Sequence, residues 1–98
     1  MYGTVARIRI KPGMEEQLLA FDREEQEANI AGFIGEYIYR LDANPQEYYL
    51  VVVFESKEAY FANANSPEQD ARYRRFREML ESDPKWHDGE IVAAHPVR

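Results

Sequence analysis

Apolar and polar residues alternate over residues 2–11, a pattern that predicts a β-strand with one apolar face and one partly charged face. Pro12 and Gly13 end this strand, because proline lacks a donor for the sheet ladder and glycine permits a sharp turn. The two faces of the predicted strand carry Thr4, Ala6, Ile8 and Ile10 on the apolar side, and Val5, Arg7, Arg9 and Lys11 on the other.

Helical spacing of apolar residues predicts two long helices and a short one between them. Gly32 stands where a glycine commonly ends a helix. Ser56 and Ser66 are both suited to cap a helix N-terminus, and Pro67 occupies the favoured first helical position after Ser66. The three predicted helices cover residues 14–31, 56–60 and 66–81.

Three further strands complete the pattern, over residues 33–42, 47–55 and 86–97. Asn44 and Pro45 mark a turn between the first two, which therefore form a hairpin. Gly89 within the last strand indicates a bulge or a close backbone approach. The resulting order β-α-β-β-α-β predicts an α+β fold of the ferredoxin-like, split βαβ type, with a four-stranded antiparallel sheet and helices on one face.

The strand at residues 47–55 is apolar on both faces, since Tyr49, Val51 and Val53 point away from the neighbours that alternate with them. A strand of this kind is usually buried on both sides, whereas the predicted helices cover only one. We therefore expect a second copy to cover the other face, giving a homodimer. The charged residues expected on that uncovered face, where they could pair across the interface or line its rim, are Arg7, Arg9, Glu36, Arg40 and Glu55.

The bulk composition narrows the class of protein. A chain of 98 residues predicts a single domain over residues 1–98. Its net charge of −6 argues against nucleic-acid binding, and no apolar run approaches the length needed to span a membrane. The charged N-terminal strand does not resemble a signal peptide, and the absence of cysteine fits a cytoplasmic protein.

Several segments resemble the antibiotic biosynthesis monooxygenase (ABM) domain family. They are the GF near the second strand, VVVFESKEAY, SPEQDARYRRFREML and PKWHDGEIV, and together they extend over nearly the whole chain. The resemblance implies a dimeric α+β barrel of ferredoxin-like protomers. It also implies a choice of activities, since some members oxidise aromatic polyketides without metal or flavin, some degrade haem, and many have no known activity.

The residues that the resemblance places at functional positions depart from both active branches. Haem-degrading members use a helical His, a first-strand Asn and a Trp, and Tyr73, Ala6 and Asn63 stand there instead. We therefore expect no haem and no other cofactor. In the polyketide-oxidising branch the expected Tyr is present as Tyr60, Phe54 replaces a Trp, and Leu50 replaces an Asn. The Arg of that branch corresponds to one of Arg72, Arg74, Arg75 and Arg77.

These observations predict a pocket between the helices and the sheet, with Ala6, Leu50 and Phe54 as its floor and Trp86 at its mouth as substrate-binding residues. The candidate catalytic residues are Tyr60 and His87. Tyr60 matches the Tyr of the polyketide-oxidising branch, and His87 can serve as a general base because histidine titrates near neutral pH. The alternative for His87 is a surface group beside Asp88.

No metal site is expected, because strand alternation separates His87 from Asp88 and no helical His pair exists. The run of arginines in RYRRFR, residues 72–77, is expected to be a solvated helix face. The charged run REEQE, residues 23–27, is expected to be another.

Two classes of function remain open. One is a cofactor-independent monooxygenase that acts on an aromatic or electron-rich small molecule. The other is a non-catalytic dimer that binds a small molecule or has a structural role. Tyr60 favours the first, and the apolar Leu50 favours the second.

Overall fold

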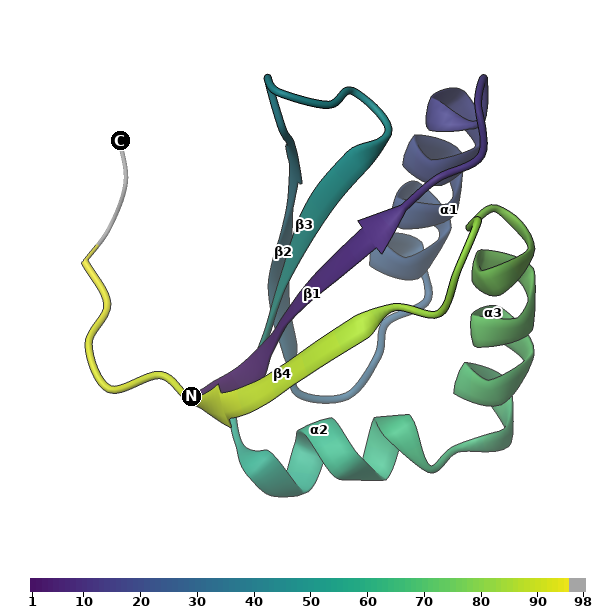
Figure 1. The fold of residues 1–98 in the computed structure, drawn as a ribbon. Coiled ribbons are helices and arrows are strands. Elements are labelled where there is room, and N and C mark those ends of the chain that lie inside the picture. The colour runs from purple at the N-terminus through teal and green to yellow at the C-terminus, as the bar shows by residue number, and fades with distance from the viewer. Residues whose placement is uncertain (96–98) are drawn as a thin grey trace.

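A computed structural model describes residues 1–95. Within these residues, four strands and three helices follow one another in an order that agrees with the ferredoxin-like prediction (Figure 1). The elements are β1 (Tyr2–Arg9), α1 (Glu15–Glu27), β2 (Phe33–Arg40), β3 (Glu47–Phe54), α2 (Lys57–Ala64), α3 (Pro67–Glu78) and β4 (Lys85–Glu90).

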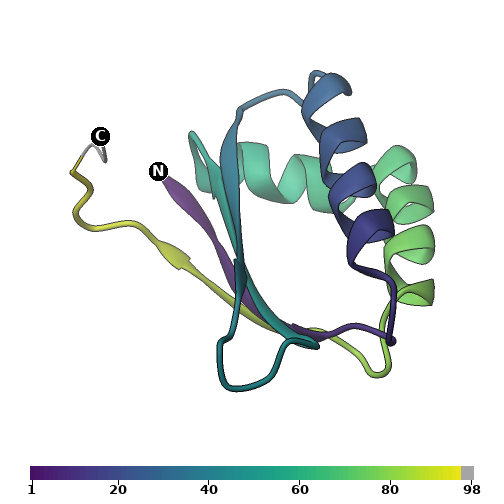
Figure 2. The ribbon, with the colours of Figure 1, turned by 90° about the horizontal axis from the view of Figure 1, so that it is seen from above.

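The strands form one antiparallel sheet in the order β2-β3-β1-β4, and all three helices lie on the same side of it (Figure 2). The predicted fold class is therefore confirmed. Below the helices, the core consists of side chains from the inner faces of β1 and β3 and from α1, α3 and the segment after α3. Its buried members are Ala6, Ile8, Ile10, Leu18, Tyr48, Leu50, Phe76, Met79 and Leu80.

Two serine caps fix where α2 and α3 begin. The Oγ atoms of Ser56 and Ser66 each accept a hydrogen bond of 3.1 Å, from the backbone N–H groups of Ala59 and Gln69 respectively. Each bond satisfies a donor that the first helical turn would otherwise leave free. α2 is longer than predicted and reaches Ala64, whereas α3 ends at Glu78, three residues before its predicted end.

The end of α1 differs from the prediction. This helix stops at Glu27 rather than at residue 31, and Asn29, with φ of 54°, adopts the left-handed conformation that follows a helix end. Asparagine tolerates this conformation better than most residues. Gly32 (φ 77°) lies in the next turn, where a Cβ atom would come within 2.5 Å of the Cβ of Ala59.

The hairpin between β2 and β3 is confirmed. Asn44 closes its turn, since its Oδ1 accepts from the N–H of Gln46 (3.1 Å) and its carbonyl accepts from the N–H of Glu47 (2.9 Å). The last strand is shorter than predicted and ends at Glu90, which pairs with Tyr2, the first residue of β1. Beyond it, only the N–H of Ile91 still donates to the carbonyl of Met1 (3.0 Å) within residues 1–95. The final two residues of the predicted strand, 96 and 97, lie outside the described residues.

The faces of β2 are reversed relative to the prediction. Glu36 and Arg40 pair with Val52 and Tyr48, which places them on the helix side of the sheet, and Arg40 binds Glu15 of α1 (2.6 Å). A β-bulge at Ile34 is the reason. Phe33 pairs with Phe54 on the helix side, so regular alternation predicts that Glu36 points away, but the extra residue shifts the alternation by one.

The middle of the sheet face away from the helices is apolar, and within residues 1–95 no helix covers it (Figure 2). Tyr37, Tyr39 and Val5 on this bare face are 65%, 62% and 41% exposed. Tyr49, Val51 and Val53 of β3 lie between them and are half-buried. Large apolar patches of this kind mark interaction surfaces more often than free surface.

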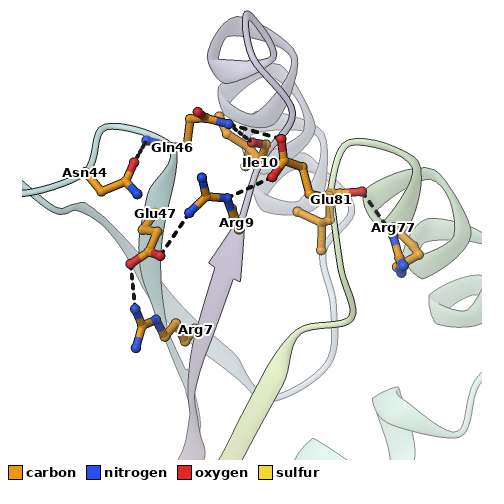
Figure 3. Close-up of polar contacts among 9 residues, drawn as sticks. Arg7, Arg9, Ile10, Asn44, Gln46, Glu47, Arg77 and Glu81 are labelled. Atoms are coloured by element: carbon orange, nitrogen blue, oxygen red, sulfur yellow. Dashed lines mark hydrogen bonds and ion pairs between the residues drawn. The ribbon is translucent and has the colours of Figure 1, made fainter.

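Arg7 and Arg9, expected either to pair across a dimer interface or to line its rim, form ion pairs within the chain (Figure 3). Glu47 binds both, at 2.6 Å from Arg7 and 3.2 Å from Arg9, and Glu81 binds Arg9 at 2.8 Å. The cluster links β1, β3 and the segment after α3. Because these pairs are largely exposed, their main effect is to fix the local geometry rather than to add much stability.

The close backbone approach expected at Gly89 occurs instead at Gly3, its partner on β1. A Cβ atom at Gly3 would lie 1.8 Å from the carbonyl oxygen of Val52 on β3, whereas one at Gly89 would meet nothing within 4 Å. The pairing of β1 with β4 also has no register shift at Gly89. Glycine is therefore required at residue 3 and not at residue 89.

We expect Gly3→Ala to lower the free energy of unfolding by about 3 kcal/mol, because the methyl group must push β1 and β3 apart. Gly89→Ala is the matched control, with an expected change of less than about 0.5 kcal/mol. Urea denaturation followed by far-UV circular dichroism measures both. Equal stabilities for the two variants would contradict the close approach.

Candidate functional site

A cavity of about 380 Å³ lies between the helices and the inner face of the sheet. Cavities of this size and apolar character are typical of small-molecule sites. Eight aromatic and five carboxyl side chains line it, and within residues 1–95 no Lys, Arg or His does. The aromatic residues are Phe21, Phe33, Phe54, Tyr60, Phe61, Tyr73, Phe76 and Trp86; the carboxyl residues are Asp22, Glu25, Glu36, Asp70 and Asp88.

One end of the cavity is organised around Tyr60. The cap at Ser56 starts α2 so that the Tyr60 ring packs edge-on against Phe54 of β3, with ring centroids 5.6 Å apart. The Tyr60 hydroxyl donates to Oδ1 of Asp88 on β4 (2.8 Å). Burial and this hydrogen bond both raise the pKa of Tyr60 above its ordinary value, so Tyr60 is a neutral, fixed phenol at physiological pH.

Three carboxyl groups meet between α1 and β2, and we call them the acid cluster: Asp22, Glu25 and Glu36. Burial raises the pKa of Glu36 to about 9, and repulsion from Glu25 and a hydrogen bond with Asp22 add to the effect. Burial likewise raises the pKa of Glu25 to about 7, although Arg72 and Arg75 of α3 oppose the rise. At neutral pH the cluster therefore holds at least one proton, on Glu36.

The hydrogen bonds of Asp22 agree with a protonated Glu36. Its Oδ2 accepts from Nε2 of Gln26 (3.0 Å), while its buried Oδ1 has no donor when Glu36 is ionised. A buried oxygen without a donor is costly. A proton on Glu36 supplies that donor.

The structure places four of the six predicted site residues in the cavity lining: Leu50, Phe54, Tyr60 and Trp86. Trp86 is 44% exposed and packs against Tyr73 with ring centroids 6.4 Å apart, which puts it at the mouth. Ala6 is fully buried beneath and does not line the cavity.

The placement of His87 corrects the sequence-based site. His87 pairs with Val5 in the sheet, so its side chain belongs to the bare face and not to the cavity. The physical reason is strand alternation. Trp86 and Asp88 face the helices, and the residue between them must face the opposite side. Asp88, rather than His87, is the polar partner of Tyr60.

None of the four arginines of α3 lines the cavity. Arg72 donates to the side chains of Gln69 (3.1 Å) and Asn63 (3.4 Å), which themselves belong to the lining. The others form surface ion pairs, and Tyr73 and Phe76 point inward as expected. The pairs are Arg74–Asp70, Arg75–Glu24 and Arg77–Asp83.

The acid cluster is the part of the site that sequence reasoning missed. Glu25 was expected on a solvated face, yet Asp22 and Glu25 follow Leu18 at helical spacings of four and seven. These spacings place both carboxyl groups on the same stripe as a core leucine, and this was the available signal. Glu36 was predicted on the opposite face of the sheet, because the bulge at Ile34 cannot be recognised from alternation alone.

Within residues 1–95 there is no group of three potential ligands arranged to hold a metal ion. In the same part of the chain, no helix has the length and apolar character needed to cross a lipid bilayer.

Comparison with known proteins agrees with this architecture. The family model described as antibiotic biosynthesis monooxygenase matches residues 1–78. The chain therefore belongs to the antibiotic biosynthesis monooxygenase family. No curated protein sequence matches it significantly.

Solved structures with the same fold share little sequence with this chain. SnoaB from Streptomyces nogalater, a cofactor-independent oxygenase, has a TM-score of 0.80 at 15% identity, covering 98% of this chain and 97% of that one. A protein from Bordetella bronchiseptica named for the same family has a TM-score of 0.78 at 22% identity, covering 94% and 97%. The NE2512 protein of unknown function from Nitrosomonas europaea has a TM-score of 0.74 at 19% identity, covering 99% and 94%.

Proposed function

We propose that this protein is a cofactor-independent monooxygenase that oxidises an electron-rich aromatic molecule in the cavity between helices and sheet. The observation that carries the proposal is the composition of that cavity, in which aromatic walls enclose carboxyl groups with a raised pKa. Membership of the monooxygenase family supports the same class of reaction.

The substrate of such a reaction must first lose a proton. A methylene or hydroxyl group activated by a conjugated ring becomes an anion that can donate electrons to O2. Glu25, with a pKa of about 7, is suited to accept that proton near neutral pH. Protonated Glu36 is suited to donate a hydrogen bond to the oxygen on which negative charge develops.

The remaining steps belong to the substrate and oxygen. The substrate anion transfers an electron to O2, the two radicals combine to a peroxide, and loss of water leaves a new carbonyl, so a methylene and O2 give a carbonyl and water. The aromatic walls exclude solvent from the anion and the peroxide. Tyr60, held on Asp88, would orient the ring at the other end of the cavity.

We also propose that a second copy of the chain covers the bare face, giving a dimer with sheet packed against sheet. Each valine that stays exposed on this face forgoes roughly 1.5 kcal/mol of burial, and Tyr37 and Tyr39 add large apolar rings beside them. His87 would lie at this interface, which removes it from the chemistry of the cavity.

A non-catalytic ligand-binding dimer is the second candidate. It is favoured by Leu50, which lines the cavity at the position where the resemblance to polyketide-oxidising members places an Asn. At that position Leu50 offers no amide to orient a substrate carbonyl or a peroxide, and the neutral polar side chains of the lining, Thr4, Asn63 and Gln69, come from other elements.

Oxygen uptake with a panel of phenols, anthrones and hydroquinones separates these candidates. We expect uptake above a protein-free blank, lowered roughly 100-fold in Glu25→Gln, since general bases contribute about that factor. Tyr60→Phe should raise KM with a smaller change in kcat, because it loses only an orienting hydroxyl.

Glu27→Gln on the outer face of α1 is the control and should match the wild type. Absence of uptake with every substrate would favour the ligand-binding candidate. A fall in uptake in His87→Gln but not in Glu25→Gln would place the chemistry on the bare face instead.

A further inference from the structure

We propose that the ligand of this cavity carries a positive charge, as an aromatic molecule bearing an amine or quaternary ammonium group, with its cationic end at the acid cluster and its ring toward Tyr60 and Trp86. The inference deepens the proposed function by naming the charge of the ligand. It rests on the same cavity being the ligand site.

The charge of the lining is the first argument. All five ionisable lining groups other than tyrosine are carboxyl groups, and they come from α1, β2, α3 and β4. Asp70 and Asp88 are already engaged, with Arg74 (3.0 Å) and with Tyr60 (2.8 Å). The three members of the acid cluster form no salt bridge with any group in residues 1–95.

The second argument is the unmet need for a positive charge or donor at this end of the cavity. Asp22 Oδ1 is buried and lacks a partner unless Glu36 holds a proton. Arg72 and Arg75 are not part of the lining, although both act on the pKa of Glu25. Arg75 binds Glu24 and lies over the Phe21 ring, 5.6 Å from its centroid. A cationic ligand would supply the missing charge and favour the ionised carboxylates, that of Glu25 near neutral pH and that of Glu36 only near pH 9.

The third argument is that the rest of the wall is aromatic. Ring faces attract cations, and quaternary ammonium groups are commonly recognised by a combination of aromatic rings and carboxylates. Phe21 and Phe33 line the cavity together with the acid cluster. An anionic ligand would meet five carboxyl groups and no Lys, Arg or His in the lining within residues 1–95, and should be rejected.

A positive charge on the substrate also suits the proposed reaction. Deprotonation creates an anion in a cavity that already holds carboxylates, and a cationic group on the same molecule offsets that charge. The affinity for a cation should also depend on pH, because binding competes with the protons held by Glu25 and Glu36.

Three matched probes test the ligand charge: benzyltrimethylammonium, its neutral carbon isostere neopentylbenzene, and phenylacetate. Trp86, the sole tryptophan of the chain, stands at the cavity mouth, so its fluorescence can report binding. Benzyltrimethylammonium keeps its charge at every pH. Its affinity should therefore rise by about tenfold or more between pH 6 and pH 9 as the acid cluster loses protons.

The neutral probe should bind with an affinity that does not change with pH, and phenylacetate should bind at least tenfold more weakly than the cation at pH 9. Glu36→Gln should weaken the cation by about tenfold at pH 9 and flatten its pH dependence, with no change for the neutral probe. Glu27→Gln, which alters the same charge on the outer face of α1, should change none of these values.

Preference for the neutral probe or for phenylacetate at pH 9 would overturn the inference, as would binding of none of the three. Cation binding without oxygen uptake by any aromatic amine would uphold the inference and contradict the proposed oxygenase. Oxygen uptake with only neutral or anionic substrates would uphold the proposed oxygenase and contradict a cationic ligand. Calorimetry in buffers of different ionisation enthalpy gives an independent check, since the cation should release protons on binding and the neutral probe should not.

Discussion

Raising the pH from 5 to 9 should destabilise this protein by several kcal/mol, and Glu36→Gln should remove much of that loss. Folding raises the pKa of Glu36 from 4.5 to about 9 and that of Glu25 from 4.5 to about 7. Between those values the folded state holds protons that the unfolded chain has released. Stability therefore falls as pH rises, by about 1.4 kcal/mol per pH unit for each such group.

Glu36→Gln separates the loss of stability caused by Glu36 from any other effect of pH. At pH 5 Glu36 is protonated in the folded protein, and a Gln amide can replace its hydrogen bond to Asp22, so the two proteins should have similar stability. Above pH 7 the variant should be the more stable, by roughly 2–4 kcal/mol at pH 9. Urea denaturation at pH 5, 7 and 9 measures the difference, with Glu27→Gln expected to follow the wild type. Parallel curves for wild type and Glu36→Gln would show that the acid cluster is solvated.

Val51→Asp should abolish the proposed dimer. Val51 lies at the middle of the bare face, paired with Val5 on one side and Tyr37 on the other. A carboxylate buried there between two sheets would have no partner, at a cost large enough to prevent association. Light scattering after gel filtration should give twice the 11.5 kDa chain mass for the wild type. The variant should give the chain mass itself or aggregate.

Leu19→Asp provides the control, because Leu19 is 40% exposed on α1, which lies on the other side of the sheet. It introduces the same charge and should keep the wild-type mass. A monodisperse wild-type monomer at micromolar concentration would remove the dimer from the proposal, and a Val51→Asp dimer would place the interface elsewhere.

The parts of the fold that follow from local rules could be predicted from the sequence. Alternation in β1 identified the inner residues Ala6 and Ile8, and the serine caps placed α2 and α3 to within one residue at their starts. Helix ends were less certain, because Asn29 could end α1 as well as Gly32 could. Which glycine is sterically required depends on how closely two strands approach, and Gly3 carries no local sign of it.

The candidate site was predictable where it depends on strand parity within β3 and on the start of α2. Leu50, Phe54 and Tyr60 were assigned to the site by the family resemblance, and these two local features agree with their place in the lining. The carboxyl groups of the cavity were not predicted. Which side Glu36 faces depends on the extra residue in β2, and which side Asp88 faces depends on the register of β4 with β1. His87 was chosen for its titration near neutral pH, whereas alternation, applied through the register of Ala6 with Trp86, places Asp88 in the cavity and His87 on the bare face.

The bulge at Ile34 also affects how residues are matched between members of this family. Phe33 and Glu36 are three positions apart, yet both line the cavity, which a regular strand does not allow. In a relative without the extra residue, the corresponding side chains would be two positions apart. An ungapped alignment across this segment would then equate a cavity residue of one protein with an outward-facing residue of the other. A gap of one position at Ile34 is therefore needed before any residue of β2 is assigned a role by homology.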